Sequence, residues 1–506
     1  MDRCHRGEGR LRAGRVAECA DGDVGAVGHP DDPGAVRGDE VDDVGHGLAD
    51  DVLRPVDHDE RRVRRLLDAL HEIGVHSESA AVQSCDDDHG PSWFSIVPPP
   101  SVGRDAARPW AAPRTIGGVG GGVSGGHYPG PVLTTTDLTV GPRGRRFCSA
   151  LLDQVLDADG PAAERLGQVR FWAEYHLARE RGDGVSLFGA GTDPRPVPEP
   201  APPVTEVAAA LDAAFATVTP SDVGVRHVLR ALADTTASAM SWQEPDAADV
   251  VLADPALAPV VARLATAWAG LPAVRAVLDA PRGAPQWSTV FHGEHGRHPE
   301  HGEGPDAAGR ALAAWRTALE DEVAAVRPRD RRRPADAAVG GSWWSTPPDG
   351  LVTTTAAHGA NGPVGLWAVE DDFGWERAAV APVHTSPGAR VLVVDDADDW
   401  AALCRRWSVD VSGTTRRHDW YHTTGRDGDW VTPDWAGVAE EHDAVHLTVL
   451  CWLRAAGTGV PVGAGAASVI AGWTPGATVW LRDPQPVPGA TEDWVFDDND
   501  LGWHRA

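Results

Sequence analysis

The chain contains no lysine, so all 45 of its basic residues are arginine. This absence excludes a Schiff-base lysine, the lysine of a phosphate-binding P-loop and the strand lysine of a protein kinase. Pyridoxal-dependent enzymes and standard nucleoside triphosphatases are therefore ruled out as functions. Such a complete preference for arginine is typical of codon usage in a genome rich in G and C.

Cysteines are also few, and the six that are present are scattered with no C-x-x-C pair. This spacing favours reduced thiols over a disulfide framework or a zinc finger. The sequence has neither a long apolar run that could span a membrane nor the charged and apolar regions of a signal peptide. Together these absences predict a cytoplasmic protein without a membrane partner.

Positive charge is in the minority, and the formal net charge is −29. Nucleic acids bind clustered positive charge, so we expect no nucleic-acid partner. The one dense basic run lies within residues 327–339, where prolines flank it. We interpret this run as a solvated, arginine-rich linker and not as a phosphate-binding patch.

Composition divides the first two thirds of the chain into two segments. Residues 1–131 show little apolar periodicity, and we expect either a disordered leader or a stretch translated from a misassigned start codon. Residues 132–326 carry apolar side chains every three or four positions and predict an all-helical domain, interrupted by a proline-rich spacer at 194–203. The predicted helices cover residues 145–156, 161–181, 204–218, 220–241, 257–269 and 305–326.

The last third has a different character, because 14 of the 21 tryptophans lie between Trp343 and Trp503. Short apolar runs alternate with candidate helices in residues 340–484, which predicts an α+β domain with a large aromatic core. Within it, residues 391–394 read as a buried strand followed by a helix that Asp396 or Asp398 caps. Residues 485–506 form an acidic tail that we expect to wrap or fray. The predicted fold class is thus multidomain, with a helical domain before a Trp-rich α+β domain.

One stretch of this α+β domain carries clear local signals. Thr432 and Pro433 are typical of a helix cap and first turn, and we expect that helix to run through Trp435 and Val438. The apolar period then changes from three or four residues to two. This change predicts a strand with His446 on its polar face.

Two histidine-rich segments are candidates for metal binding. The run from His418 to His422 has the spacing of a metalloprotease helix with Asp419 as the acid, but its Trp, Tyr and Thr residues favour a strand or turn. The histidines of a loop at 291–304 would align in an extended conformation, yet a loop without supporting contacts binds metal poorly. We therefore expect no metal site and a solvated loop.

Two other groups each leave two interpretations open. His446, close to Glu441 and Asp443, is either a general base oriented by a carboxylate or a half-exposed histidine that water or a threonine satisfies. The run Trp343–Pro347, WWSTP, is either a strand whose hydroxyls reach a cofactor or a core strand whose hydroxyls bond locally.

Residues 340–484 resemble a group of uncharacterised actinobacterial proteins in the runs WWSTP, ARVLVVDDADDWAALCRRW, RRHDWYHTTG, WAGVAEEHDAVHLTV and AGWTPGATVWL. The order of a Ser-Thr segment and a later acid is also similar to that of ADP-ribosyltransferases, although no Glu-x-Glu or Gln-x-Glu pair is present. This resemblance implies an ADP-ribosyltransferase-like or nucleotide-binding activity with NAD as cofactor. The candidate catalytic residues are then Glu441, His446 and His418. The candidate substrate-binding residues are Trp343, Trp344, Ser345, Thr346 and Arg417.

The alternative function is a non-enzymatic interaction, immunity or scaffold protein whose helical domain docks a protein partner. An enzyme should gather the candidate residues around one pocket. A scaffold should leave them dispersed and expose an apolar patch on its helices.

Overall fold

The computed structural model describes eight stretches of the chain, all within one compact unit: residues 133–182, 200–280, 284–293, 296–297, 306–370, 374–386, 388–486 and 490–506. The expected leader, residues 1–131, lies outside the described residues. Most of the proline-rich spacer and most of the histidine-rich loop lie outside them as well. The expectations for these three segments therefore stay predictions.

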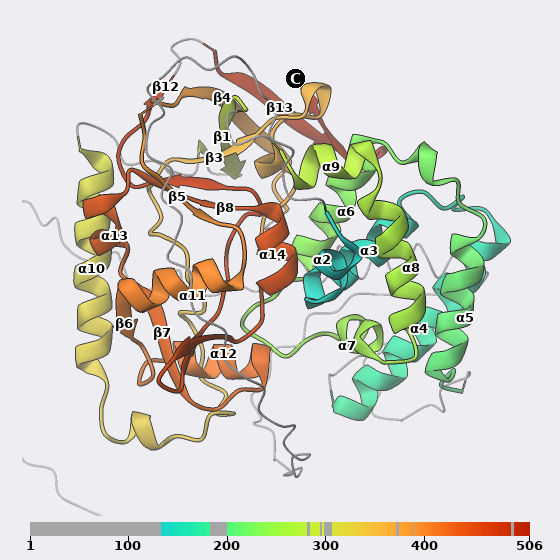
Figure 1. Cartoon of the computed structure of the whole chain (residues 1–506), viewed down its shortest axis with the longest axis horizontal. Coiled ribbons are helices and arrows are strands. Elements are labelled where there is room, and N and C mark those ends of the chain that lie inside the picture. Colours follow the sequence, from blue (N-terminus) through green and yellow to red (C-terminus); the bar gives the residue numbers. More distant parts are fainter. Residues whose placement is uncertain are drawn as a thin grey trace, which may run out of the picture. The chain divides into compact units, whose positions relative to one another are not determined.

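The first described part is helical, as its apolar periodicity predicts (Figure 1). Helix α3 lies at its centre and contacts α2, α6, α7 and α8. Proline occupies the first turn of α3, α4 and α9, where its missing N–H disrupts no helical hydrogen bond. The elements are α2 (Thr135–Thr139), α3 (Pro142–Asp153), α4 (Pro161–Arg181), α5 (Val204–Phe215), η1 (Pro220–Asp222), α6 (Val225–Ala237), α7 (Ala247–Ala253), α8 (Ala258–Ala269) and α9 (Pro272–Leu278).

A ten-stranded sheet dominates the rest of the described chain, with the order β14-β13-β4-β1-β3-β11-β8-β5. Strands β12 and β2 attach to β4 and β1. Strands β5 and β8 are parallel, whereas the remaining neighbours are antiparallel. The strands are β1 (Gln286–Gly293), β2 (Gly296–Arg297), β3 (Thr353–Ala356), β4 (Arg377–His384), β5 (Val391–Val394), β8 (Ala444–Leu447), β11 (Thr478–Trp480), β12 (Gln485–Pro486), β13 (Glu492–Asp497) and β14 (Gly502–Arg505).

A smaller sheet has the order β6-β7-β10-β9, with β6 (Ser408–Asp410), β7 (Asp429–Pro433), β9 (Val460–Gly463) and β10 (Ala466–Ser468). The helices after α9 are α10 (Ala307–Ala325), η2 (Asp330–Arg332), η3 (Gly359–Asn361), η4 (Val364–Leu366), α11 (Ala397–Arg406), α12 (Arg416–Thr424), α13 (Trp435–Glu441) and α14 (Val449–Ala455). Helix α11 contacts β5 of the large sheet and β7, β9 and β10 of the small one. Beside it the buried rings of Trp400, Trp435 and Trp473 meet, with centroids 5.8 to 6.3 Å apart. The tryptophans thus build an aromatic core, as predicted.

The helical and sheet-forming parts share one core. Strands β1 and β2 lie within residues 132–326, which were predicted to be all-helical, so that prediction is wrong for this segment. Strand β1 precedes the arginine-rich segment 327–339, yet it pairs with β3 and β4, which follow that segment. Helix α14 packs against α2, α3 and α9. Gly141, which begins α3, approaches α14 so closely that a Cβ would lie 2.3 Å from the carbonyl oxygen of Arg454. A single apolar cluster accordingly extends from Leu133 to Trp503.

Helix α12 corrects the strand or turn expected between His418 and His422. Trp420 is fully buried on this helix, and its ring lies 5.5 Å from that of Trp430. Gly425 then ends the helix in a left-handed conformation, with φ of +68°. Burial of the indole in the tertiary structure outweighs the weak extended preference of Trp, Tyr and Thr.

Three further boundaries differ from the predictions. Pro433 is the last residue of β7, and Asp434 caps α13 by accepting a hydrogen bond from Gly437 N–H at 3.1 Å. The following strand, β8, ends at Leu447, because Thr448 caps α14. The end of the chain, expected to be an acidic tail, contributes β13 and β14 to the large sheet, where Trp494 and Trp503 are buried.

Two predictions for the strand at 391–394 hold, since β5 covers these residues and Asp396 caps α11. Among the described helices, none is by itself long and apolar enough to cross a membrane. Helices α7 and α8 meet that length and composition test only as a pair, with a 93° bend between them.

Candidate functional site

Two of the predicted catalytic residues have separate partners. His446 is half-buried on β8, and its Nδ1 lies 2.9 Å from Oγ1 of Thr478. This contact matches the interpretation of a sheet histidine that a threonine satisfies. Glu441, at the end of α13, forms a half-exposed ion pair with Arg406. Neither side chain is hydrogen-bonded to the other.

The third, His418, is buried on α12 and engaged at both ring nitrogens. Its Nδ1 lies 2.9 Å from the carbonyl oxygen of Ala335, and its Nε2 accepts from Nε of Arg417 at 3.3 Å. Burial lowers the pKa of His418, which favours a neutral ring that donates to Ala335. Although α12 places His418 and His422 one turn apart, His418 has no nitrogen left for a metal. Arg417 also binds the carbonyl oxygens of Asp330, Arg331 and Arg333, so it holds the arginine-rich segment in place.

The run Trp343–Pro347 is not a strand, in contrast to both of its predicted interpretations. Ser345 is buried and fastened to Ala471: its Oγ accepts from Ala471 N–H at 3.1 Å, and its N–H donates to Ala471 O at 2.9 Å. The hydroxyl therefore bonds locally. The ring of Trp343 lies 4.8 Å from that of Trp242 and 5.9 Å from that of Trp344, which is 40% exposed.

The eight candidate residues thus take part in several different contacts within the described part of the chain. Thr346, the last of them, packs beside Gly472, where a Cβ would lie 3.6 Å from its methyl group. None of the eight lines either of the two cavities described next. Each instead joins two segments of the fold.

A cavity of about 210 Å³ lies among helices α3 to α8. For comparison, an apolar cavity of about 150 Å³ holds benzene, so a molecule of amino-acid size fits here. Part of the lining is apolar and comes mainly from α5, α7 and the start of α8: Ala150, Val207, Leu211, Ala248, Val251, Leu252 and Leu257. The other part is polar and comes from α3, α4 and α6: Arg146, Ser149, Asp153, Arg170, Glu174 and Asp234.

Carboxylates orient both arginines of the lining. Arg170 binds Asp153 through Nη1 at 2.7 Å and Nη2 at 3.3 Å. Arg146 donates from Nη1 to Asp246 at 3.0 Å, and the same nitrogen lies 3.6 Å from Asp249. Its Nε and Nη2 have no hydrogen-bond partner in the described part of the chain. Arg146 therefore offers pre-oriented donors to a ligand.

Glu174 is the unpaired acid of this cavity. Its carboxylate forms neither a hydrogen bond nor an ion pair with any residue that the structure describes. Burial raises the pKa of Glu174 to about 7, although the charges of Arg170 and Arg146 oppose that shift. A carboxyl group that changes protonation near neutral pH inside a cavity is a mark of a functional site.

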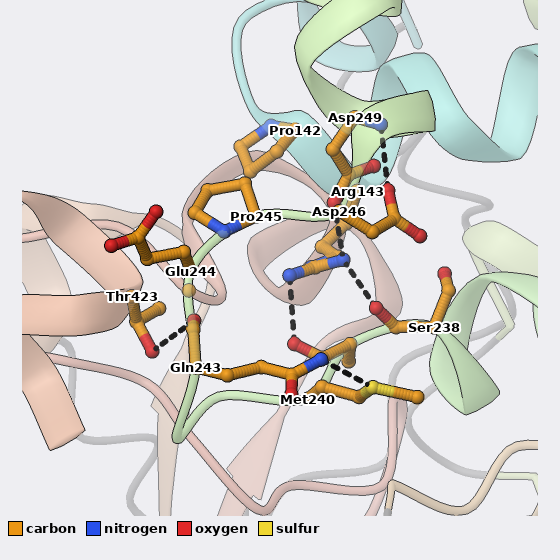
Figure 2. Close-up of a pocket in the computed structure, with 12 residues that line it drawn as sticks. Pro142, Arg143, Ser238, Met240, Gln243, Glu244, Pro245, Asp246, Asp249 and Thr423 are labelled. Carbon is orange, nitrogen blue, oxygen red and sulfur yellow. Dashed lines mark hydrogen bonds and ion pairs between the residues drawn. The ribbon is translucent and has the colours of Figure 1, made fainter. Parts of the chain in front are cut away.

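A water-sized hollow of about 20 Å³ adjoins the same charged cluster (Figure 2). In it, Arg143 donates from Nη1 to Asp249 at 3.0 Å and to the carbonyl of Ser238 at 3.2 Å. Its Nη2 donates to the carbonyl of Ala239 at 2.8 Å. Asp249 therefore lies between Arg143 in the hollow and Arg146 in the cavity, and it connects the two.

One surface cluster has the composition of a metal site: Asp497, Asp500 and His504. Arg226 already forms an ion pair with Asp500 at 2.7 Å, and Nε2 of His504 lies 2.9 Å from the same carboxylate. Arg226 thus already supplies the positive charge that a metal ion would bring to Asp500. The side chains of Asp497 and His504 are also exposed to solvent. The cluster is explained as an ion-pair network.

Sequence reasoning missed the cavity, although a signal for it was present. Arg146 and Asp153 are seven residues apart on α3, and Arg170 and Glu174 are four apart on α4. Both spacings put charged residues on one helix face. Where such faces of two packed helices meet, they indicate a polar site between the helices.

No family model, no curated protein and no solved structure matches this chain. The candidate site therefore rests on the contacts of the chain itself. Its charged and apolar lining distinguishes the cavity among α3 to α8 as that site.

Proposed function

We propose that the helical part of this protein binds a small organic molecule in the cavity among α3 to α8. The observation that carries this proposal is the divided lining, in which apolar side chains of α5 and α7 meet charged side chains of α3 and α4. Pockets for small molecules have this character: a mostly apolar wall fixes the body of the ligand, and a few polar groups orient it.

The competing explanation is a cavity that holds only water. The pairs Arg170–Asp153 and Arg146–Asp246 would be satisfied in that case too. Water would also solvate the half-buried carboxylate of Glu174, but it would leave the apolar side chains of α5 and α7 in contact with solvent, which a ligand would cover.

A thermal-shift screen of the full chain against small amphiphilic molecules tests this function. A ligand that binds only the folded state raises its stability by about 2.7 kcal/mol at a hundred times its Kd. Ala248→Leu, which fills part of the cavity from α7, should abolish the shift. Ala163→Leu is the matched control, because Ala163 lies on α4 outside the cavity lining and the shift should persist.

Shifts that Ala248→Leu and Ala163→Leu reduce equally would overturn the proposed site. The predicted NAD-dependent activity of residues 340–484, and the alternative of a scaffold that docks a protein partner, stay predictions. The candidate residues of the NAD-dependent activity are occupied by separate packing contacts, so the cavity has stronger support than that activity.

A further inference from the structure

We infer that the ligand of this cavity is a zwitterion of amino-acid size: an α-amino acid with an aliphatic or aromatic side chain. This inference rests on the proposed function. The carboxylate of the amino acid would bind Nε and Nη2 of Arg146, and its ammonium group would bind Glu174. Its side chain would lie against the apolar residues of α5 and α7.

Charge favours a ligand that carries both signs. Arg170 is already paired with Asp153, Arg143 with Asp249, and Arg146 with Asp246 through Nη1 alone. A cation alone would satisfy Glu174 but leave Nε and Nη2 of Arg146 without acceptors. An anion alone would reach Arg146 but leave Glu174 without a counter-charge. A zwitterion satisfies both groups with charge-assisted hydrogen bonds, and polar groups that are buried without partners weaken binding.

Asp234, the remaining acid of the lining, is engaged on the α6 side of the cavity. It accepts a hydrogen bond from Nε2 of Gln154 at 2.9 Å and has a further partner. Arg146 and Glu174 are therefore the groups that we expect to bind the charges of the ligand.

Arg146 and Glu174 face the same cavity without pairing with each other. Arg146 and Glu174 attract each other electrostatically, yet they do not form an ion pair. Their charges are therefore close but not in contact. An ammonium and a carboxylate that are joined through one carbon can bridge such a gap, since each then makes a charge-assisted hydrogen bond.

The size of the cavity suits the rest of such a molecule. With about 210 Å³, the cavity exceeds the volume that holds a benzene ring. Val207 and Leu211 on α5 and Val251 and Leu252 on α7 contribute the apolar surface that a branched or aromatic side chain requires. The side chain of Asp153 is 40% exposed, so the charged end of the cavity lies nearer to solvent than the apolar end does.

Isothermal titration calorimetry on the full chain at about pH 8, where Glu174 is ionised, tests the inference. The probes are L-leucine and L-phenylalanine, together with two analogues of leucine that each lack one charge. Isoamylamine lacks the carboxylate, and 4-methylpentanoate lacks the ammonium group. We expect at least one amino acid to bind, and each single-charge analogue to bind at least about tenfold more weakly than leucine or not at all.

Glu174→Gln supplies the second arm, because it keeps the shape of the side chain and removes its charge. The variant should lose the preference for leucine over 4-methylpentanoate. Glu206→Gln is the matched control: Glu206 forms an exposed ion pair with Arg165 on the outside of α5, so the preference should persist. A melting curve shows that each variant is folded.

The outcomes separate the inference from the function on which it rests. If either single-charge analogue binds as tightly as leucine, the zwitterion inference is wrong, while the proposed function stands. The same holds if neither amino acid binds but another molecule gives a shift that Ala248→Leu abolishes. If no molecule gives such a shift, both are wrong.

Discussion

Asp249 accepts a hydrogen bond from Nη1 of Arg143 at 3.0 Å, and the two side chains are only 3% and 4% exposed. This buried ion pair joins α7 to the first turn of α3. The same carboxylate also lies 3.6 Å from Arg146, which lines the cavity. The candidate site is thereby built into the core of the helical part.

Asp249→Asn should lower the free energy of unfolding by about 3 to 5 kcal/mol, because Arg143 would stay buried without its counter-charge. Equilibrium unfolding in urea, followed by circular dichroism, measures this loss. Arg165→Gln breaks the exposed ion pair with Glu206 and should cost less than about 1 kcal/mol. Equal losses for the two variants would contradict the structural importance of the buried pair.

Glu370 should make stability depend on pH. It accepts hydrogen bonds from Trp452 Nε1 at 2.7 Å and Gly472 N–H at 2.6 Å, while burial raises its pKa from 4.5 to about 7. The folded protein thus keeps a proton that the unfolded chain has already released. This contribution to stability is fully present below about pH 4.5 and is lost as the pH rises through about 7.

The variant Glu370→Gln cannot titrate at this position, so comparison with the wild type isolates its effect. Its deficit in stability should be largest near about pH 5 and should shrink by about pH 8. Urea midpoints across this range measure the deficit. A deficit that grows with pH would show that folding lowers the pKa of Glu370 instead of raising it.

Two glycines should respond to alanine with opposite signs. Gly141→Ala would place its Cβ 2.3 Å from the carbonyl oxygen of Arg454, so we expect destabilisation of about 1 to 3 kcal/mol or more. Gly167, inside α4, has no other atom within 4 Å of an added Cβ, and Gly167→Ala should stabilise by about 0.5 to 1 kcal/mol. Thermal melts of both variants test the close approach of α3 to α14, which two shifts of the same sign would contradict.

Ligand affinity should fall as the medium becomes more acidic. Binding an ammonium group requires ionised Glu174, whose pKa burial raises to about 7. The charged groups that act on it are Arg170, Arg146, Asp246 and Asp153. Below about pH 7 we expect the affinity for an amino acid to drop up to about tenfold per pH unit, with proton release on binding.

Calorimetry in two buffers of different ionisation enthalpy measures that release, which Glu174→Gln should eliminate. Affinity that rises on acidification would contradict binding of ammonium to Glu174.

The predicted NAD-dependent activity carries an expectation of its own. If the indoles of Trp343 and Trp344 stack on a nicotinamide or adenine ring, NAD should quench tryptophan emission in a saturable way. Glu441→Gln should then preserve binding but abolish nicotinamide release, because the acid would stabilise positive charge in the transition state. Absence of quenching at several millimolar NAD would contradict the nucleotide prediction and would leave the cavity proposal untouched.

Local pattern in the sequence determined much of the secondary structure. Helix α4 covers Pro161–Arg181 as predicted, and α8 begins one residue after its expected start at Leu257. Strand β5 and the cap of Asp396 on α11 were predicted as well. These features depend on neighbours within one or two turns, and the period of apolar residues, proline and capping side chains encode those neighbours directly.

Only the tertiary structure decided the rest. Residues 416–424 became a helix because Trp420 is buried against Trp430, a contact that the local preferences of Trp, Tyr and Thr do not reveal. Strand β1 pairs with β3 and β4 across the arginine-rich segment, and local sequence pattern does not specify which distant strands pair. The cavity is the clearest case: Arg146 and Glu174 belong to different helices, and how those helices pack sets the distance between their charges. Sequence periodicity assigns a side chain to a helix face, but it cannot specify what another helix brings to that face.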